Sequence, residues 1–188
     1  MNREDDNYYV EEVLSGQTQA YAELVGRHKE MVYTIAIGLL QIREEAEEVS
    51  QDAFLKAYQA LSKFKKQAKF STWLYRIVYN ECISRLRKRK LNDISLDENR
   101  ISISDSLIVE ENNFNEEKKQ RMLQEALMDL PKEDKAIILL YYFENLSIEE
   151  ISVITALSKS NIKIRLFRIR NKLHERLSKS FKMEMIEI

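Results

Sequence analysis

Hydrophobic residues recur at steps of three and four along most of the chain, which is the spacing of an α-helix. The first such segment spans residues 18–40 and predicts a helix. Its apolar positions are Tyr21, Leu24, Val25, Met31, Val32 and Ile35. His28 falls in the same stripe, and no cysteine or second histidine lies near it in the sequence. We therefore interpret His28 as a packed or half-buried histidine rather than a ligand.

A narrower apolar stripe predicts a second helix over residues 43–61, REEAEEVSQDAFLKAYQAL. The stripe consists of Ala46, Val49, Ala53, Ala57 and Ala60. Glu45, Glu48 and Asp52 repeat the same spacing one position earlier, so they form an acidic stripe about 100° around the helix. Carboxylates spread along a helix exterior do not converge on one point, which argues against a metal or acid–base site. The acidic stripe is either a solvated face or a docking face for a basic partner helix.

Residues 63–69, KFKKQAK, lack any helical period and predict a loop. Ser71 is a suitable N-cap for the helix that follows, through Lys90. Four of its residues share an inward face: Leu74, Ile77, Val78 and Cys82. A second stripe lies away from that core and carries Trp73, Arg76, Asn80 and Arg87.

Residues 64–80 hold five of the chain's seventeen aromatic residues and four of its lysines and arginines. Aromatic rings stack on unpaired bases at about 1–3 kcal/mol each, while cations follow the phosphates. The stretch therefore predicts a site for single-stranded nucleic acid. The alternative is that Phe70, Trp73 and Tyr75 are core residues, but this does not explain the ten bases present between residues 63 and 90.

The second half of the chain has the pattern of a helix-turn-helix. Met122, Ala126 and Leu130 recur in a helix that begins at Lys118, and Pro131 starts the next one. Ser147 and Glu150 form a capping box before a short helix. The turn LSKS follows at residues 157–160, and Ser160 is a suitable cap for a strongly basic helix. Two helices joined by about four residues, the second basic, are typical of this motif.

The basic helix has two distinct faces. Its core side carries Ile162, Leu166, Ile169 and Leu173. Lys163, Phe167 and Arg170 lie about 100° around, with Ile164 and Arg168 further out. A phenylalanine beside cations near a helix N-terminus is placed to contact thymine methyl groups. The alternative places Phe167 at the rim of the core. We expect His174, next to Glu175, to be exposed.

Composition and charge define the domain organisation. Three glycines and one proline in 188 residues favour helices over hairpins. Residues 63–90 carry ten bases and one acid, residues 92–117 one base and eight acids, and residues 158–182 nine bases and one acid. We predict an all-α fold: a helical domain at 1–91, a flexible acidic linker at 92–117 and a helix-turn-helix domain at 118–188. Fully extended, the linker spans up to about 85–95 Å.

The sequence excludes several other classes of protein. A single cysteine, Cys82, excludes an internal disulfide or a thiolate metal cluster, and its apolar neighbours predict burial. The acidic start does not resemble a signal peptide, and the apolar runs are far short of the ~20 residues of a membrane span. We expect a soluble, cytoplasmic protein without membrane insertion, catalytic residues, metal or cofactor.

Four segments in this order resemble bacterial RNA polymerase sigma factors of the extracytoplasmic-function type, over essentially the whole chain. They are EEAEEVSQDAFLKAY, KFSTWLYRIVYN followed by RLRKRK, DLP at 129–131, and LSIEEISVITALSKSNIKIRLFRIRNKL. The resemblance implies two helical domains on a flexible linker. The implied partners are core RNA polymerase, through its β′ clamp helices and β flap, promoter DNA, and an anti-sigma factor.

The resemblance also implies residue roles. Docking on the β′ clamp helices would use Glu45, Glu48, Gln51 and Asp52. Melting and reading of the promoter −10 element would use Phe64, Lys65, Lys66, Lys69, Trp73, Arg76, Asn80 and Arg87. Reading of the −35 element in the major groove would use Ser160, Lys163, Ile164, Phe167 and Arg168. The family usually has Asp where Ser84 stands, and Gly-Thr-Val-Lys/Arg-Ser where residues 160–164 read Ser-Asn-Ile-Lys-Ile. Ile164 cannot hydrogen-bond a base edge.

Two other classes of protein are alternatives to a sigma factor. A stand-alone helix-turn-helix regulator would bind duplex DNA without polymerase and needs no ring-rich loop. A metal-dependent nuclease or deaminase would need convergent carboxylates or a zinc set, which two distant histidines and one cysteine do not supply. A sigma factor alone is expected to bind promoters weakly or not at all, and to direct initiation with core polymerase.

Overall fold

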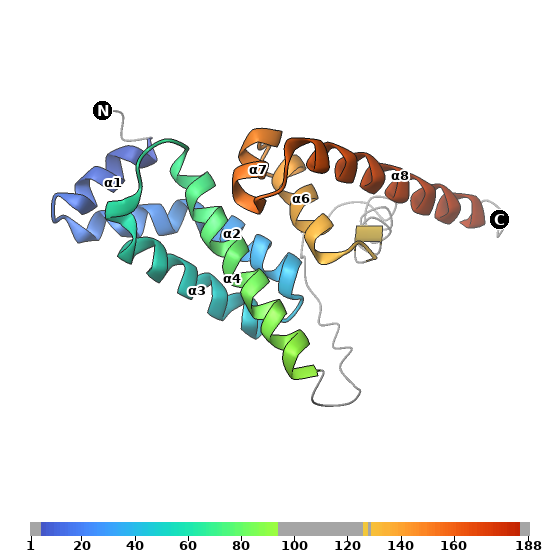
Figure 1. Cartoon of the computed structure of the whole chain (residues 1–188), viewed down its shortest axis with the longest axis horizontal. Coiled ribbons are helices and arrows are strands. Elements are labelled where there is room, and N and C mark those ends of the chain that lie inside the picture. The colour runs from blue at the N-terminus through green and yellow to red at the C-terminus, as the bar shows by residue number, and fades with distance from the viewer. Residues whose placement is uncertain (1–4, 94–125, 128, 185–188) are drawn as a thin grey trace.

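The computed structural model describes residues 5–93, 126–127 and 129–184. Every regular element in this part of the chain is helical (Figure 1). The first domain consists of α1 (Asp6–Leu14), α2 (Tyr21–Leu40), α3 (Arg43–Gln59) and α4 (Phe70–Asp93). The second consists of α6 (Lys132–Tyr142), α7 (Ile148–Thr155) and α8 (Lys159–Glu184). Short 3₁₀ turns lie at Thr18–Ala20 and Leu61–Lys63. The predicted all-helical fold is confirmed.

The first domain packs α2 against both α3 and α4. Along α2 the buried residues are Leu24, Val32, Ile35, Ala36, Leu39 and Leu40, which extends the stripe that the sequence predicts. The alanine stripe of α3 is also confirmed, because Ala46, Ala53 and Ala57 are fully buried. Small side chains at a helix contact let the two axes approach closely. Along α4 the predicted inward face is buried at Leu74, Val78 and Cys82.

Helix α1 is an element that the sequence analysis did not anticipate. Asp5 caps it, because its side chain accepts a hydrogen bond from the backbone amide of Asn7 at 3.1 Å. Val10 and Val13 are buried against the rest of the domain. The helical spacing of these two valines was the available signal, although the surrounding acidic residues mask it.

The second domain has the predicted helix-turn-helix, with one cap confirmed and another corrected. Ser147 and Glu150 form the expected capping box at the start of α7. At α8 the cap is Ser158 rather than Ser160, since the Ser158 hydroxyl accepts a hydrogen bond from the Asn161 amide at 3.2 Å. Similarly, α4 begins at Phe70, so Ser71 lies inside its first turn rather than at its cap. In both helices the chain turns helical before the predicted position.

Two predicted segments lie largely outside the described residues. They are the acidic segment 92–117 and the helix expected over 118–130. Within the described part of the latter, Ala126 and Leu130 are buried, as the predicted stripe requires. Leu130 packs with Ile138 and Ile169, which attaches it to α6 and α8.

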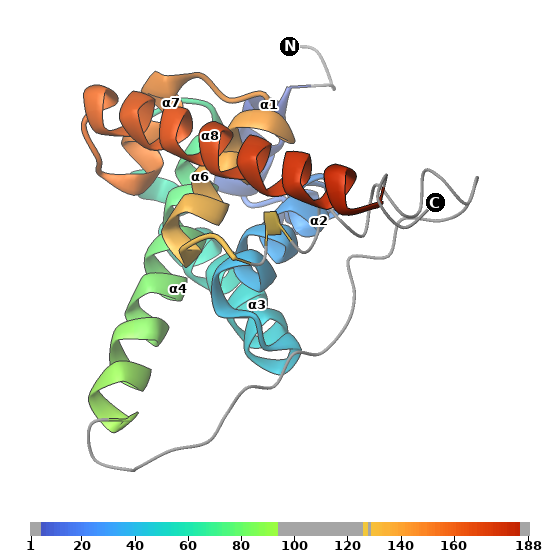
Figure 2. The same cartoon turned by 90° about the vertical axis from the view of Figure 1, so that its right-hand side faces the viewer.

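The two domains pack against each other, an arrangement that the sequence pattern does not reveal. Helix α7 contacts α4, and α6 contacts α2. Buried residues of both domains form one continuous hydrophobic cluster, in which Tyr75 and Val78 of α4 join Ile137, Leu140 and Ile151. The C-terminal half of α4 extends away from α6–α8 in both views (Figures 1 and 2). None of the described helices combines the length and apolarity that a membrane crossing requires.

Candidate nucleic-acid interface

One face of α4 carries the predicted polar and aromatic stripe. Arg76, Asn80 and Arg87 are exposed, and Trp73 is partly exposed. They lie opposite the buried face because helical geometry separates the two stripes. The sequence therefore identified a surface that the structure leaves accessible to a ligand.

The Trp73 ring packs against the ring of Phe64, in the loop before α4, and against the ring of Phe70, in the first turn of α4. The centroid of the Trp73 ring lies 5.3 Å from that of Phe64 and 5.8 Å from that of Phe70. Phe64 is only 8% exposed and Phe70 only 1% exposed. Phe64 therefore packs against the protein side of the Trp73 ring and offers little surface to a base. The alternative assignment to the core is confirmed for Phe70 and Tyr75, but only in part for Trp73.

The loop between Phe64 and Phe70 presents exposed lysines at positions 65, 66 and 69. Lys66 has a left-handed backbone with φ of 54°, and its ammonium group pairs with Glu11 of α1. Lys69 Nζ lies 3.0 Å from Glu150 Oε1 in the second domain. Two of the predicted phosphate-binding cations are thus already paired with carboxylates of the same chain.

The acidic stripe of α3 is partly engaged within the protein. Glu48 Oε2 lies 2.7 Å from Arg85 Nη2, and Glu45 pairs with Arg89. The hydrogen bond that Arg85 donates to the Glu48 carboxylate raises the pKa of the Arg85 guanidinium above its ordinary value. Gln51 is exposed and Asp52 half-exposed, and no ion pair of Asp52 is found within the described residues. The stripe therefore holds α3 to α4 at Glu45 and Glu48 and presents a surface at Gln51 and Asp52.

An apolar extension of this surface was missed from the sequence. Leu55 is 60% exposed and Tyr58 is 40% exposed, one and two turns beyond Gln51 on α3. A helix face that joins polar groups to exposed apolar side chains suits a protein partner better than solvent. The sequence did contain the signal for this surface: residues 52, 55 and 58 are spaced three apart, which places them along one face of a helix.

The N-terminal half of α8 exposes the predicted base-reading residues. Lys163 and Arg168 are exposed, Ile164 is 50% exposed and Phe167 is 63% exposed. The rim-of-core alternative for Phe167 is therefore wrong. Ser160 is also exposed, and its hydroxyl lies 3.2 Å from that of Ser158. On the opposite side Ile162, Leu166 and Ile169 are buried, as predicted, while Leu173 is half-buried.

Two arginines that the sequence analysis did not single out as structural fix α8 in place. Arg165 Nη1 donates to Asp134 Oδ1 at 2.7 Å, which ties α8 to the first turn of α6. Arg170 Nε donates to the Tyr142 hydroxyl at 2.7 Å, and its guanidinium lies 5.7 Å from the centre of the Tyr141 ring. These contacts orient the exposed face of α8 relative to α6. Long-range partners of this kind cannot be read from local sequence.

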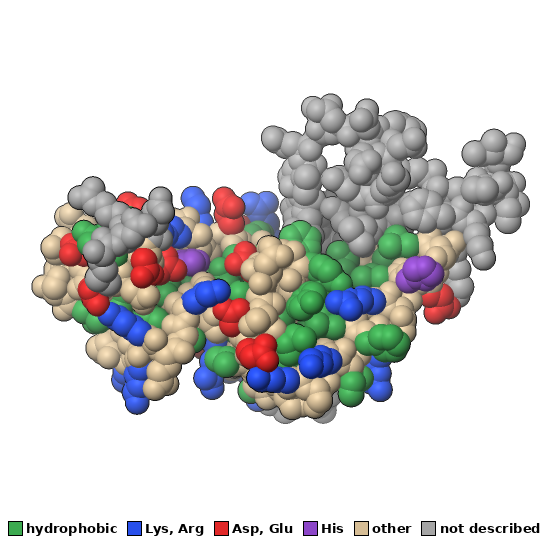
Figure 3. Space-filling model, turned by 90° about the horizontal axis from the view of Figure 1, so that it is seen from above, with side chains coloured by type: hydrophobic (Ala, Val, Ile, Leu, Met, Phe, Trp, Pro, Cys, Tyr) green, Lys and Arg blue, Asp and Glu red, His purple; other side chains and the backbone are tan. Residues whose placement is uncertain are grey.

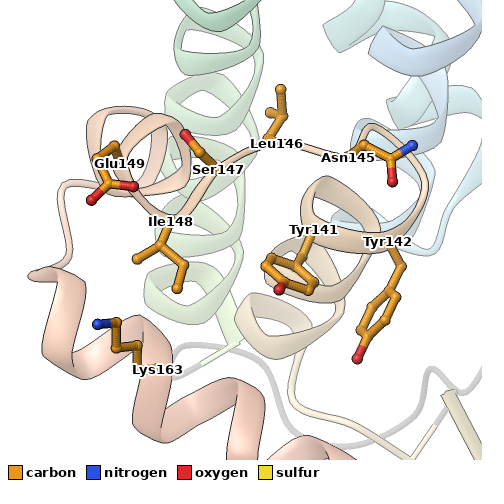
Figure 4. Close-up of a pocket in the computed structure, with 8 residues that line it drawn as sticks. All are labelled: Tyr141, Tyr142, Asn145, Leu146, Ser147, Ile148, Glu149 and Lys163. Atoms are coloured by element: carbon orange, nitrogen blue, oxygen red, sulfur yellow. The ribbon is translucent and has the colours of Figure 1, made fainter.

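Beside this face lies an open hollow of about 580 Å³. Tyr141 and Tyr142 border it on one side, and Lys163 and Glu149 border it on the other (Figure 4). In the space-filling view, hydrophobic side chains lie among lysines and arginines over the half of the surface formed by the second domain (Figure 3). This mixture suits a ligand that has both apolar edges and negative charge.

No group of three or more His, Cys, Asp or Glu side chains among the described residues is arranged to hold a metal ion. Cys82 is buried, as predicted, and burial raises the pKa of its thiol to about 12. A thiol of that pKa stays protonated near neutral pH and is neither a nucleophile nor a ligand.

Comparison with known families identifies both halves of the chain. Residues 24–91 match Sigma-70 region 2, and residues 120–173 match Sigma-70, region 4. A protein with both regions is of the sigma class, the non-catalytic polymerase subunits that start transcription. The partly exposed Trp73 falls in the first matched region and the exposed Phe167 in the second.

Curated relatives narrow the class. The chain is 31% identical to the ECF RNA polymerase sigma factor SigW of Bacillus subtilis, over 89% of this chain and 94% of the relative. It is 26% identical to the RNA polymerase sigma-H factor of Pseudomonas aeruginosa, over 94% and 96% of the two chains. The ECF RNA polymerase sigma-E factor of Escherichia coli is 28% identical, over 92% and 94%. The chain belongs to the ECF RNA polymerase sigma factors of the sigma-70 family, and its function is that of a sigma factor.

Two solved structures share the fold. The sigma factor RpoE, in complex with the anti-sigma factor NepR from Bartonella quintana, matches with a TM-score of 0.68 and 23% identity. That match covers 84% of this chain and 96% of RpoE. CnrH, in complex with the cytosolic domain of CnrY, matches with a TM-score of 0.65 and 23% identity, over 93% and 97% of the two chains.

Proposed function

We propose that the exposed face of α4 captures an unpaired strand of the −10 element during promoter opening. Trp73 supplies an aromatic ring that packs against Phe64. The same face of α4 carries the exposed residues Arg76, Asn80 and Arg87. Stacking and cation–phosphate contacts together suit a single strand better than a closed duplex. The exposure of this stripe, set on a rigid helix, is the observation that carries the proposal.

The loop before α4 supplies phosphate contacts through Lys65, Lys66 and Lys69. All three are exposed, although Lys66 and Lys69 pair with carboxylates of the same chain. Carboxylate and phosphate are interchangeable partners for an ammonium group. Strand binding by the loop therefore exchanges these pairs for phosphate contacts.

The N-terminal half of α8 reads the −35 element from the major groove. Its contact residues are Ser160, Lys163, Ile164, Phe167 and Arg168. The two cations suit phosphates and guanine edges, and Ile164 and Phe167 suit thymine methyl groups. The side chain of Ile164 neither donates nor accepts a hydrogen bond. At this position we therefore expect apolar contact with a thymine methyl group to determine the base preference.

Core polymerase binds at the surface of α3, and the second domain contacts the β flap. The exposed Gln51 and half-exposed Asp52, with Leu55 next to them, support docking on the β′ clamp helices. Glu45 and Glu48 contribute less directly because they hold Arg89 and Arg85. The protein acts in the cytoplasm, where the polymerase is, and an anti-sigma factor is its expected regulator.

We propose domain boundaries at residues 1–91, 92–117 and 118–188. The matched regions end at residue 91 and resume at residue 120, which supports these limits.

Transcription in vitro with core polymerase on a promoter library tests the function as a whole. We expect start sites that depend on the protein. Duplex footprints that form without polymerase, with no new start sites, would overturn the proposal.

Replacing Phe167 by alanine is expected to reduce transcription from −35-dependent promoters by about tenfold or more, since burying a phenylalanine side chain is worth about 1.5–3 kcal/mol. The side chain is 63% exposed, so the change should leave stability within about 0.5 kcal/mol. Run-off transcription with purified holoenzyme measures the effect. Asn171→Ala, another exposed position of α8, is the matched control. Equal losses in the two variants would remove Phe167 from the reading surface.

A further inference from the structure

Asn161 is exposed in the first turn of α8, on the same side of the helix as two of the proposed base-reading residues. It precedes Ile164 by three positions and Arg168 by seven, so the three side chains recur along one face. In a helix-turn-helix, the residues near the N-terminus of the second helix are the ones that reach base edges. The position of Asn161 therefore places its amide within reach of the major groove.

The side-chain oxygen of Asn161 is held by Arg165, one turn further along α8. Arg165 Nε donates to Asn161 Oδ1 at 3.1 Å. A guanidinium group has donors only, so the amide atom that faces it must be the oxygen and not the nitrogen. Arg165 is fixed in turn by α6, because its Nη1 donates to Asp134 Oδ1 at 2.7 Å and to Glu133 Oε2 at 3.4 Å. A contact between two helices thus sets the direction of the Asn161 amide.

The backbone of Asn161 is held as well. Its N–H donates to the Ser158 hydroxyl at 3.2 Å, the hydrogen bond that caps α8. Within the described part of the chain, no hydrogen bond of Asn161 Nδ2 is found. The two N–H donors of Nδ2 are therefore the part of this side chain that remains for a ligand. An amide that is held in advance loses less conformational freedom on binding than a mobile one.

A group that presents donors alone distinguishes the bases in the major groove. Guanine and thymine present a keto oxygen there, O6 or O4, whereas adenine and cytosine present an amino group, N6 or N4. An asparagine that is free to turn favours adenine, because its oxygen accepts from N6 while its nitrogen donates to N7. With its oxygen directed to Arg165, Asn161 loses that pairing with adenine and donates to a keto oxygen instead.

We propose that Asn161 is a further specificity-determining residue of the −35 surface, that it selects a keto base, and that Arg165 is the positioning residue that imposes this choice. The inference rests on the proposed reading of the −35 element by α8. The two roles differ in kind: Asn161 contacts the base, and Arg165 acts through Asn161.

Two substitutions change the hydrogen bonds of this site in different ways. Asn161→Asp keeps the shape of the side chain but has acceptors only, so the preference should move from a keto base to an amino base, cytosine first. A carboxylate in the first turn of a helix is favourable, so α8 should remain stable. Arg165→Leu removes the donor that holds the amide, which allows Asn161 to turn and pair with adenine.

Transcription by holoenzyme from a promoter library with a randomised −35 element measures the base preference at each position. The contacted position is the one at which Asn161→Ala removes the preference. There the wild type should prefer guanine or thymine by about fivefold or more, as for a good contact between a side chain and a base. Asn161→Asp should reverse this preference, and Arg165→Leu should raise the share of adenine. In a protein that also carries Asn161→Ala, Arg165→Leu should alter no preference, because the amide through which it acts is gone.

Asn171→Asp is the matched control, since it introduces the same charge at another exposed position of α8. Any change in its transcription should be equal for all −35 sequences. Thermal unfolding verifies that each variant is folded. Arg165 also ties α8 to α6, but a loosened helix would lower transcription for all bases alike and would not favour adenine at one position.

Unaltered preferences in folded Asn161→Asp protein, or a change that is equal for all sequences, would overturn the inference. A wild-type preference for adenine or cytosine at the contacted position would overturn it as well. An effect of Arg165→Leu on base preference that persists without the Asn161 amide would show that Arg165 does not act through Asn161.

Phe167→Ala in the same library separates a failure of this inference from a failure of the proposed function. If Phe167→Ala changes the −35 preferences and Asn161→Asp does not, α8 reads the element and only the role of Asn161 is wrong. If neither variant changes any preference, the proposed reading of the −35 element by α8 is wrong too.

Discussion

A protein carrying Trp73→Ala together with Asn80→Ala is expected to bind core polymerase normally and to fail at opening promoter DNA. The two changes remove the ring and the amide from the exposed face of α4. Loss of one stacked base costs about 1–3 kcal/mol, or about 5- to 150-fold in open complexes, before the amide is counted. Permanganate reactivity of thymines in the −10 element measures the opened fraction.

The control for this prediction must separate stacking from stability, because Trp73 also packs on Phe64 and Phe70. Trp73→Phe keeps a ring at the site and is expected to retain a substantial part of the opening activity. Asn80→Ala alone changes an exposed side chain and should leave thermal unfolding unaltered. Wild-type levels of open complex in the double variant would show that this face does not hold the strand.

Charge reversal at Asp52 is expected to weaken binding of core polymerase by at least about 2 kcal/mol, or about thirtyfold, because a carboxylate opposite a basic helix is replaced by a like charge. Asp52 is a cleaner site than Glu48, whose carboxylate lies 2.7 Å from Arg85 and helps to join α3 to α4. Equilibrium titration of labelled core polymerase with the Asp52→Lys protein measures the change.

Glu23→Lys provides the same change of charge on α2, outside the proposed docking surface, and should leave the affinity for core polymerase as it is in the wild type. Equal affinities of the Asp52 and Glu23 variants for core polymerase would show that the acidic stripe is a solvated face and not a docking surface. Repeating both titrations at higher salt should narrow the difference between them, since exposed charges are screened.

Local pattern was sufficient to predict the faces of the helices. The side-chain period of a helix is fixed, so Trp73, Arg76 and Asn80 had to lie away from Leu74 and Val78 once the segment was helical. The same geometry separated Phe167 from Ile162 on α8. Helix caps were harder to predict from the sequence. Ser158 and Ser160 can both cap a helix, and only the hydrogen bond from the backbone amide of Asn161 to the Ser158 hydroxyl shows which serine caps α8.

Burial and pairing depend on residues far apart in sequence, and the pattern could not supply them. Phe64 looks like a loop residue until Phe70 and Trp73 pack against it. Glu48 looks free until Arg85 meets it from another helix. The contact between Tyr75 and Glu144 spans 69 positions and joins two domains whose charge pattern indicates only separate bodies. Each of these depends on tertiary structure.

The most direct measurement places a photocrosslinking amino acid at position 80 and assembles the holoenzyme on a promoter. Asn80 is exposed on the α4 face, so the substitution leaves the core intact. Our account predicts a crosslink to the non-template strand within the −10 element, which appears only with core polymerase and only after opening. A crosslink to closed duplex without polymerase, or none in a complex that transcribes, would contradict it.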